Sequence, residues 1–149
     1  MKIYIGSDHA GFELKETIKN FLKHGVYAFE DVGTHSRDSV DYPDYVIKVA
    51  EAVAKGEADR GIVICGTGIG SCIAANKVPG IRCALCNGPV SAKYSRLHND
   101  ANVLSLGERI IGPEIAREIV HHFLITDFEG GRHVKRLEKI KNIEEKYSR

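Results

Sequence analysis

The chain has 149 residues and a formal net charge of +1, with 43% hydrophobic and 28% charged residues. This composition excludes a disordered chain, and the balanced charge argues against a broad nucleic-acid-binding surface. We expect a single domain over residues 1–149. No apolar stretch reaches the about 20 residues that span a bilayer, and residues 1–5 are too short for a signal peptide, so a cytoplasmic location is expected.

Strand and helix patterns alternate along the chain. Short apolar runs predict five strands, over residues 2–6, 26–32, 61–65, 81–86 and 101–106. Five helices are predicted from apolar side chains at helical spacing or from Pro at the start and Gly at the end of a segment. They cover residues 12–22, 43–55, 71–77, 90–98 and 113–124. The strands are too apolar to be solvated on one face, which predicts a parallel sheet with helices on both faces. We therefore expect an α/β fold, a Rossmann-like three-layer α/β/α sandwich with a five-stranded parallel sheet.

An extra C-terminal helix is expected over residues 131–147, past the last sheet unit. Its apolar side chains recur at spacings of three and four, at Val134, Leu137, Ile140, Ile143 and Tyr147. Nothing else in the sequence obviously covers this stripe, so we expect it to pack on a partner subunit in a homo-oligomer. Arg132 and Arg136 lie one turn apart and would point together at an anion.

Polar and reactive side chains gather where the predicted strands end. They lie in Ser7-Asp8-His9, Cys65 to Gly68, Asn87 and Gly107 to Arg109. Ligands of parallel sheets bind beyond the carboxyl ends of the strands. These residues therefore predict a small-molecule site at that edge of the sheet.

The segment from Gly61 to Gly70 carries the strongest functional signal. An apolar strand ends in the thiol of Cys65 and enters a turn in which three glycines alternate with other residues. Free backbone N–H groups at the start of the following helix favour an anion. A dinucleotide site is not indicated, because the pattern is G-x-G-x-G, position 73 is Ile73, and Asn87 stands where an acidic ribose contact is needed. No Gly-Lys-Ser/Thr follows, which excludes a Walker-type loop.

The four cysteines are expected to be reduced thiols. Cys83 and Cys86 have C-x-x-C spacing, but residues three apart on a strand point to opposite faces. They therefore cannot share a metal or form a local redox pair, and we expect both to be packing residues.

Six stretches in order resemble a known family, the type B ribose-5-phosphate isomerases with the related allose- and galactose-6-phosphate isomerases. The matching stretches are Gly6 to Phe12, Asp41 to Asp44, Cys65 to Gly70 with Ala74 to Lys77, His98-Asn99, Leu106 to Arg109, and Arg132 to Arg136. The resemblance covers nearly the whole chain. It implies interconversion of ribose 5-phosphate and ribulose 5-phosphate, in the non-oxidative pentose phosphate pathway, with no metal and no organic cofactor. It also implies a homodimer or homotetramer whose active site lies between two subunits.

Three catalytic residues follow from the resemblance. Aldose–ketose isomerisation moves a proton between neighbouring carbons through an enediolate, which requires a base, an oxyanion site and an acid. Cys65 resembles the family's base, and a thiol beside a helix N-terminus and positive charge forms a thiolate more readily. Thr67 would add a hydroxyl at the oxygen atoms, and His98 resembles the acid that opens the furanose ring. Taken alone, Cys65 fits a buried core thiol and His98 fits a helix C-cap.

The remaining predicted site residues would bind the substrate. Backbone N–H groups from Gly66, Thr67, Gly68, Ile69 and Gly70 would face the enolate oxygen. Asp8 and His9 resemble sugar and phosphate contacts, Asp8 also fitting an N-cap, while Tyr42 would line the pocket and Asn99 adjoins His98. The phosphate would be held by His9, Arg109, Arg132 and Arg136, the last two from the partner subunit. We expect Arg96, Arg117 and Arg149 to be solvated surface charges.

The substrate and the class of activity leave alternatives open. Some family members lack the cysteine and carry a glutamate base just after the last glycine of the turn; here that position is Ser71, so the chain resembles the cysteine branch. One chain carries the full residue set, which favours a homo-oligomer and a pentose phosphate. The alternatives are an allose- or galactose-6-phosphate isomerase and, in another class, a non-catalytic module that binds a sugar phosphate or nucleotide.

Overall fold

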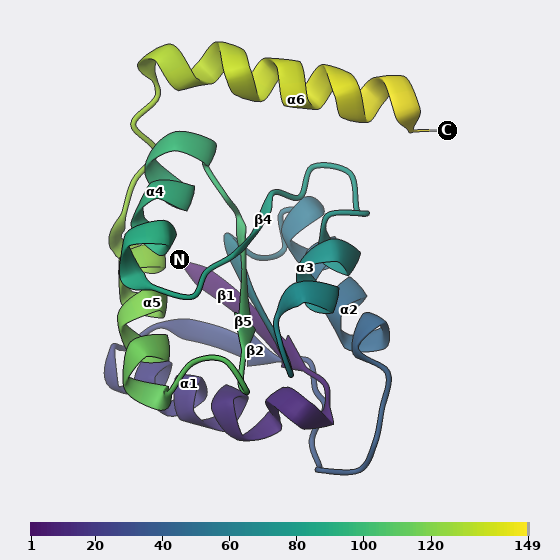
Figure 1. Ribbon diagram of the computed structural model, residues 1–149, viewed down its shortest axis with the longest axis vertical. Helices are drawn as coiled ribbons and strands as arrows, with labels where there is room; N and C mark the ends of the chain where they lie inside the picture. Colours follow the sequence, from purple (N-terminus) through teal and green to yellow (C-terminus); the bar gives the residue numbers. More distant parts are fainter. Residues whose placement is uncertain (149) are drawn as a thin grey trace.

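A five-stranded sheet forms the centre of the computed structural model, which describes residues 1–148 (Figure 1). Its strands are β1 (Lys2–Ser7), β2 (Ala28–Asp31), β3 (Arg60–Cys65), β4 (Cys83–Leu85) and β5 (Val103–Gly107). The order across the sheet is β2-β1-β3-β5-β4, and every neighbouring pair is parallel. The predicted parallel α/β architecture is confirmed, and β3, which ends at Cys65, lies in the middle of it.

Helices cover both faces of this sheet. They are α1 (Phe12–His24), preceded by the 3-10 turn η1 (His9–Gly11), then α2 (Tyr42–Ala54), α3 (Ile69–Ala75), α4 (Pro89–Asn99), α5 (Pro113–Ile125), the 3-10 turn η2 (Gly131–His133) and α6 (Val134–Tyr147). One core cluster joins the sheet to α1, α4 and α5, and a second joins it to α2 and α3. No helix within residues 1–148 has the length and apolar character needed to cross a membrane.

Strand alternation divides the core in the expected way. Ile62 and Ile64 lie in the cluster with α1, α4 and α5, whereas Val63 lies in the cluster with α2 and α3. Cys86 belongs to the first cluster, and Cys83 packs against the second. The prediction that these two thiols point to opposite faces is therefore confirmed.

The two edge strands are shorter than predicted. Residues 25–27 close α1 instead of starting β2, because the N–H groups of Val26 and Tyr27 donate to the carbonyls of Lys23 and Leu22. Val26 has φ 58°, which breaks the extended conformation. At β4, Ile81 donates to the Val78 carbonyl in a turn. Local turn bonds thus replace sheet pairing at the start of both edge strands.

Helix α6 lies across the amino ends of the strands, apart from the two layers (Figure 1). None of its residues is buried, and Ile140, Ile143 and Tyr147 are 46%, 60% and 73% exposed. Glu144 ties it to the body, since both carboxylate oxygens accept from the Gly80 N–H at 3.0 Å. The predicted apolar stripe therefore lies on a real helix and is largely uncovered within one chain.

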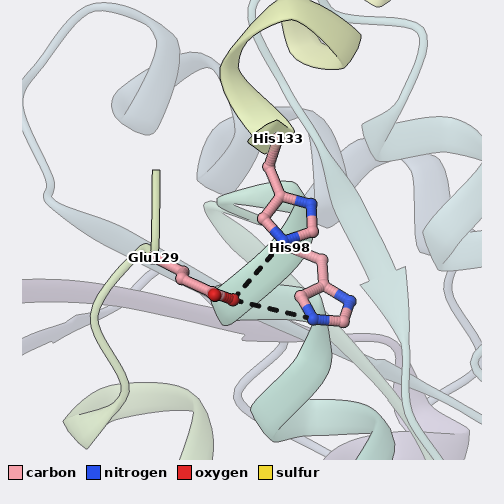
Figure 2. A group of neighbouring side chains, drawn as sticks. All are labelled: His98, Glu129 and His133. Carbon is pink, nitrogen blue, oxygen red and sulfur yellow. Dashed lines mark ion pairs between the residues drawn. The ribbon is translucent and has the colours of Figure 1, made fainter. Parts of the chain in front are cut away.

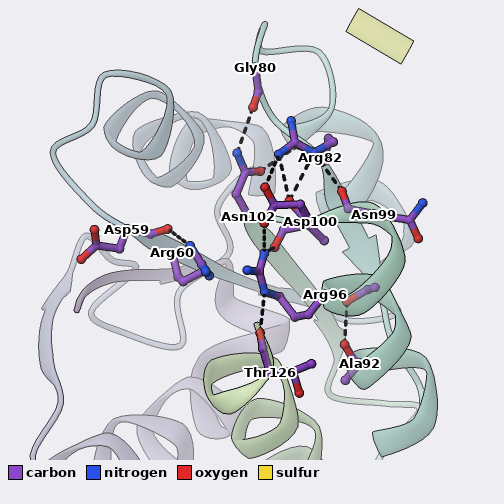
Figure 3. A network of polar contacts seen from close by, with 12 residues as sticks. Asp59, Arg60, Gly80, Arg82, Ala92, Arg96, Asn99, Asp100, Asn102 and Thr126 are labelled. Carbon is purple, nitrogen blue, oxygen red and sulfur yellow. Dashed lines mark hydrogen bonds and ion pairs between the residues drawn. The ribbon is translucent and has the colours of Figure 1, made fainter. Parts of the chain in front are cut away.

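Arg96 corrects one expectation, because it is buried and not a solvated charge (Figure 3). Its side chain is 2% exposed, and it donates to Asp100 Oδ1 at 2.8 Å, to the Ala101 carbonyl at 2.5 Å and to the Thr126 carbonyl at 3.2 Å. Arg96 therefore joins the end of α4 to the end of α5. Arg117 is half-exposed as expected, and Arg149 lies outside the described residues.

A buried charge cluster joins α1 to the end of β2. Lys15 has no exposed surface, and its Nζ donates to both carboxylate oxygens of Asp31 at 2.7 Å and to the Thr34 carbonyl at 2.6 Å. Burial by itself would raise the pKa of Asp31, but hydrogen bonds from Lys15, Lys19 and the Gly33 N–H outweigh it and hold this pKa below its usual value. The carboxylate thus stabilises the fold as an anion.

We expect Asp31→Asn to lower the free energy of unfolding by about 3–5 kcal/mol, because the Lys15 ammonium stays buried without its counter-ion. Since folding depresses the pKa of Asp31, its contribution is present above about pH 4 and is lost as the pH falls through the folded-state value. Urea unfolding at pH 7 and pH 3 measures both effects, and the gap between wild type and variant should narrow at pH 3. Glu51→Gln, which breaks an exposed pair with Lys55, is the control and should leave the midpoint nearly unchanged. Equal midpoints for the two variants at pH 7 would contradict the prediction.

Candidate active site

A cavity of about 290 Å³ opens at the carboxyl ends of β1 and β3. Its lining residues come from the turn after β1, the start of α2, the glycine turn after β3 and the loop after β5: Asp8, His9, Ala10, Tyr42, Cys65, Gly66, Thr67, Gly70 and Arg109. All of these residues except Ala10 were predicted to take part in catalysis or substrate binding, and the fold brings them together. This edge of the sheet is where the sequence predicted a site.

Cys65 lies at the floor of this cavity, with 5% of its surface exposed. The Gly68 N–H donates to its Sγ at 3.2 Å, and the Ser71 Oγ lies 3.2 Å away. Gly68 has φ 77°, a conformation that glycine adopts without strain, and this fold of the turn directs its N–H back to the sulfur. Cys65 is therefore held by polar contacts and not by core packing alone.

The turn closes tightly against its surroundings. A Cβ on Gly70 would lie 2.6 Å from the Tyr42 ring, so the absence of a side chain lets Tyr42 reach the cavity. Among the predicted oxyanion donors, the Gly68 N–H is occupied by Cys65, and the Ile69 N–H donates to Thr67 Oγ1 at 3.3 Å. Ile69 is 54% exposed and does not line the cavity. The N–H of Gly70, the second residue of α3, has no acceptor four residues back within that helix.

Asp8 and His9 are held in place by backbone groups. Asp8 Oδ1 accepts from the Gly11 N–H at 3.0 Å and caps η1, in agreement with its expected N-cap role. His9 Nδ1 lies 3.1 Å from the Val40 nitrogen and 3.2 Å from the Val40 carbonyl oxygen, so it can accept from the N–H or donate to the carbonyl according to the tautomer. These contacts fix the ring through Nδ1. Nε2 is thereby left for a ligand in the cavity.

Arg109 supplies the positive charge beside the thiol. Its N–H donates to the Gly66 carbonyl at 2.9 Å, and a Cβ on Gly66 would lie 3.3 Å from its guanidinium carbon. The carboxylate of the neighbouring Glu108 is directed to α1, where it accepts from the Leu14 N–H at 2.9 Å. The cavity therefore offers a guanidinium and an imidazole to an anionic ligand.

Four predicted site residues lie at the opposite edge of the sheet. His98 and Asn99 end α4, while Arg132 lies in η2 and Arg136 in the first turns of α6. Helices α4 and α5 start at the carboxyl ends of strands and run back, so these residues lie near the amino ends (Figure 1). A strand of five residues, such as β5, spans about 17 Å at about 3.3 Å per residue. One chain therefore does not bring them to Cys65.

His98 belongs to a group that the sequence analysis missed (Figure 2). Its ring stacks on that of His133, with centroids 4.3 Å apart and planes 19° apart. Glu129 Oε2 lies 3.9 Å from His98 Nε2 and 3.4 Å from His133 Nε2. His133 is buried, so this carboxylate faces two imidazoles, one of them shielded from water.

This group has the residue types of a metal site. Potential ligand atoms of His98, Glu129 and His133 lie within 4.8 Å of one another, the one such group found among residues 1–148. The two rings stack nearly in parallel, however, and each brings its Nε2 within ion-pair distance of the same Glu129 oxygen. The Glu129 carboxylate faces both nitrogens (Figure 2). We therefore interpret the group as an acid–base cluster.

A larger cavity of about 690 Å³ lies between the body and α6. Apolar side chains of α6 and the chain around β4 line much of it, including Ile81, Ile140, Ile143 and Tyr147. Asn99 is also on its wall. It holds none of the residues around Cys65, so size alone does not identify the site.

Comparison with known proteins identifies the family of this chain. A family model described as Ribose/Galactose Isomerase matches residues 3–140. The chain belongs to this family. Ribose-5-phosphate isomerase B of Escherichia coli is 51% identical and aligns over 97% of this chain and 97% of its own length. The structure of Clostridium thermocellum Ribose-5-Phosphate Isomerase B has a TM-score of 0.98 and 59% identity, covering 99% of this chain and 100% of that one. Ribose-5-phosphate Isomerase B from Mycoplasma genitalium, solved with bound ribulose-5-phosphate, has a TM-score of 0.93 and 42% identity, covering 99% and 97%.

Proposed function

We propose that this member of the ribose/galactose isomerase family interconverts D-ribose 5-phosphate and D-ribulose 5-phosphate. The observation that carries the proposal is the Cys65 thiol at the floor of a cavity that also presents His9 and Arg109. Relatives named ribose-5-phosphate isomerase B, similar over nearly their full length, support the same substrate. They favour a pentose phosphate over allose 6-phosphate or galactose 6-phosphate, and an enzyme over a non-catalytic module.

The proton transfer is assigned to Cys65. In the open-chain aldose, the thiolate takes the proton from C2, and the electrons of that bond form the enediolate with the negative charge on O1. The thiol then returns the proton to C1, while a proton moves from O2 to O1 with the help of the Thr67 hydroxyl. The result is the ketose, with no net change in proton count. Arg109 and the N–H of Gly70 lie where they can stabilise the enediolate.

Substrate binding is assigned to the polar side chains that line the cavity beside Cys65. His9 Nε2 and Arg109 face anionic or hydroxyl oxygens of the substrate, and Asp8 accepts from sugar hydroxyls. Tyr42 forms a wall against Gly70. Such a pocket needs no metal or organic cofactor, since each step is a proton transfer between groups that this chain supplies.

We propose that the site is completed by a second copy of the chain in a homodimer or homotetramer. His98, Asn99, Arg132 and Arg136 lie too far from Cys65 within one chain, and α6 leaves its apolar stripe uncovered. In a symmetric pair these residues would reach the partner's cavity, where His98 opens the furanose ring and the arginines bind the phosphate. Glu129 would support the protonated His98. Free thiols throughout fit a cytoplasmic location.

Incubation with ribose 5-phosphate in deuterated water tests the proposed function. We expect ketose signals to appear by NMR, with loss of the C2 proton signal as the enediolate exchanges with solvent. Ribose, allose and galactose phosphates tried side by side define the sugar, and the pentose phosphate should turn over fastest. Binding of the sugar phosphate without ketose formation or exchange above buffer would instead support the non-catalytic module.

A further inference from the structure

Two buried serines connect the Cys65 thiol to the backbone of its own turn. Ser71 Oγ lies 3.2 Å from Cys65 Sγ and 2.8 Å from Ser105 Oγ. Ser105 Oγ donates to the Gly68 carbonyl at 2.7 Å, and Ser71 Oγ lies within donating distance of the same carbonyl at 3.2 Å. Neither serine has any exposed surface. Ser71 comes from α3 and Ser105 from β5, so two separate elements meet near the sulfur, and neither serine lines the cavity.

These contacts can be ordered in two directions, because each hydroxyl donates one hydrogen bond and accepts others. With Cys65 as a thiol, S–H donates to Ser71, Ser71 donates to Ser105 or to the Gly68 carbonyl, and Ser105 donates to that carbonyl. With Cys65 as a thiolate, the Ser71 hydroxyl and the Gly68 N–H both donate to sulfur, and Ser105 donates to Ser71. The Cys72 N–H donates to the Gly68 carbonyl at 3.1 Å in either case, so that oxygen stays paired.

We propose that Ser71 and Ser105 are positioning residues for Cys65, forming a hydroxyl relay that reverses its direction each time the sulfur gains or loses a proton. The inference rests on the proposed function, in which Cys65 alternates between thiolate and thiol during every turnover. No proton passes along the relay. Each hydroxyl keeps its own hydrogen and rotates, and the substrate proton stays on sulfur until it returns to the sugar.

The relay accounts for a burial pattern that packing does not require. Two hydroxyls beside an apolar core cost free energy unless every one is paired, and alanine would fill nearly the same volume. Hydrogen bonds to an ionised group are about twice as strong as those between neutral groups, so the thiolate gains most from Ser71. The relay therefore favours the form of Cys65 that starts the reaction and still satisfies the form that ends it.

Ser71→Ala tests the relay. We expect kcat at pH 7 to fall by about 10–100-fold with KM within about twofold, and the rising limb of the pH–rate profile to move to higher pH. Ser105→Ala should act in the same direction with a smaller effect, because its contact with sulfur is indirect. Ser71→Thr keeps the hydroxyl and should recover most of kcat. The control is Ser95→Ala, since Ser95 is also buried but donates to the Ala92 carbonyl of its own helix.

A second readout needs no substrate. The rate of Cys65 labelling by iodoacetamide is measured as a function of pH, and peptide mass spectrometry distinguishes Cys65 from the other three cysteines. In Ser71→Ala, the pH at which this labelling rate is half-maximal should be higher than in the wild type. The relay is overturned if Ser71→Ala has the same labelling midpoint and kcat as the wild type. It is also overturned if Ser95→Ala changes both quantities as much as Ser71→Ala does. If Ser71→Ala fails to fold, the labelling midpoint of Ser105→Ala decides in the same way. A wild type without turnover would defeat the proposed function, while the labelling result would still decide on the relay.

Discussion

Replacing Cys65 by alanine should lower kcat for ribose 5-phosphate by about 10²–10⁴-fold, the range that a positioned base contributes, with little change in KM. The thiol lies at the floor of the cavity, whereas the charged groups that would bind the substrate come from His9 and Arg109. Binding should therefore survive the loss of the base. Steady-state kinetics and calorimetric titration with the sugar phosphate measure the two effects separately.

Cys72 provides the matched control for this variant. Hydrogen bonds with Cys83, the Leu85 backbone and Asn76 lower the pKa of Cys72 to about 7 even though burial opposes the shift, so the Cys72 thiol ionises near neutral pH. It lies on α3 beside Ser71, but it does not line the cavity, and its Sγ donates to the Cys83 carbonyl at 3.4 Å. Cys72→Ala should retain kcat. A fall in Cys72→Ala as large as that in Cys65→Ala, or unchanged kinetics in Cys65→Ala, would remove Cys65 as the base.

The sheet and the position of the cavity could be predicted because they depend on local patterns. Each strand is an apolar run followed by glycine or a polar turn, and parallel strands bring their carboxyl ends to one edge. The motif around Cys65 placed a thiol at that edge, and the structure brings Asp8, Tyr42 and Arg109 to it from distant parts of the chain. Periodicity also predicted α6 and its exposed stripe, and the family that the motifs indicated is confirmed.

What could not be predicted depends on which elements meet in space. Arg96 reads as a surface charge from its sequence neighbours, because nothing local shows that the carbonyl of Thr126 and the carboxylate of Asp100 will surround it (Figure 3). Glu129 pairs with His98 only once α5 has run back beside α4. Ser71 was distinguished in the sequence only because the resembled family has some members with a glutamate base at that position, and its contact with Cys65 depends on the fold of the turn.

Mixing two inactive variants should restore activity if the site is shared between subunits. Cys65→Ala removes the base from one edge of the sheet, and Arg132→Ala removes the proposed phosphate contact from the other. In a mixed dimer one site carries both defects and the other carries neither. Random exchange of subunits at equal concentrations makes half of the dimers mixed, so about a quarter of wild-type activity is expected. The measurement is kcat per site after mild unfolding and refolding together.

The pairing of variants decides where each residue acts. Cys65→Ala mixed with His9→Ala should stay inactive, because both residues line the same cavity and no mixed site would be intact in both. Recovery of activity with Cys65→Ala and His9→Ala would contradict the shared site. So would a lack of recovery with Cys65→Ala and Arg132→Ala when both chains have refolded.

Light scattering on a chain lacking residues 131–149 tests the oligomeric state directly. Because this truncation removes the uncovered apolar stripe on α6, the shortened chain should be a monomer. A site completed across a two-fold axis would bring the proposed phosphate-binding arginines, which lie at the amino ends of the strands in their own chain, to the Cys65 of the partner subunit.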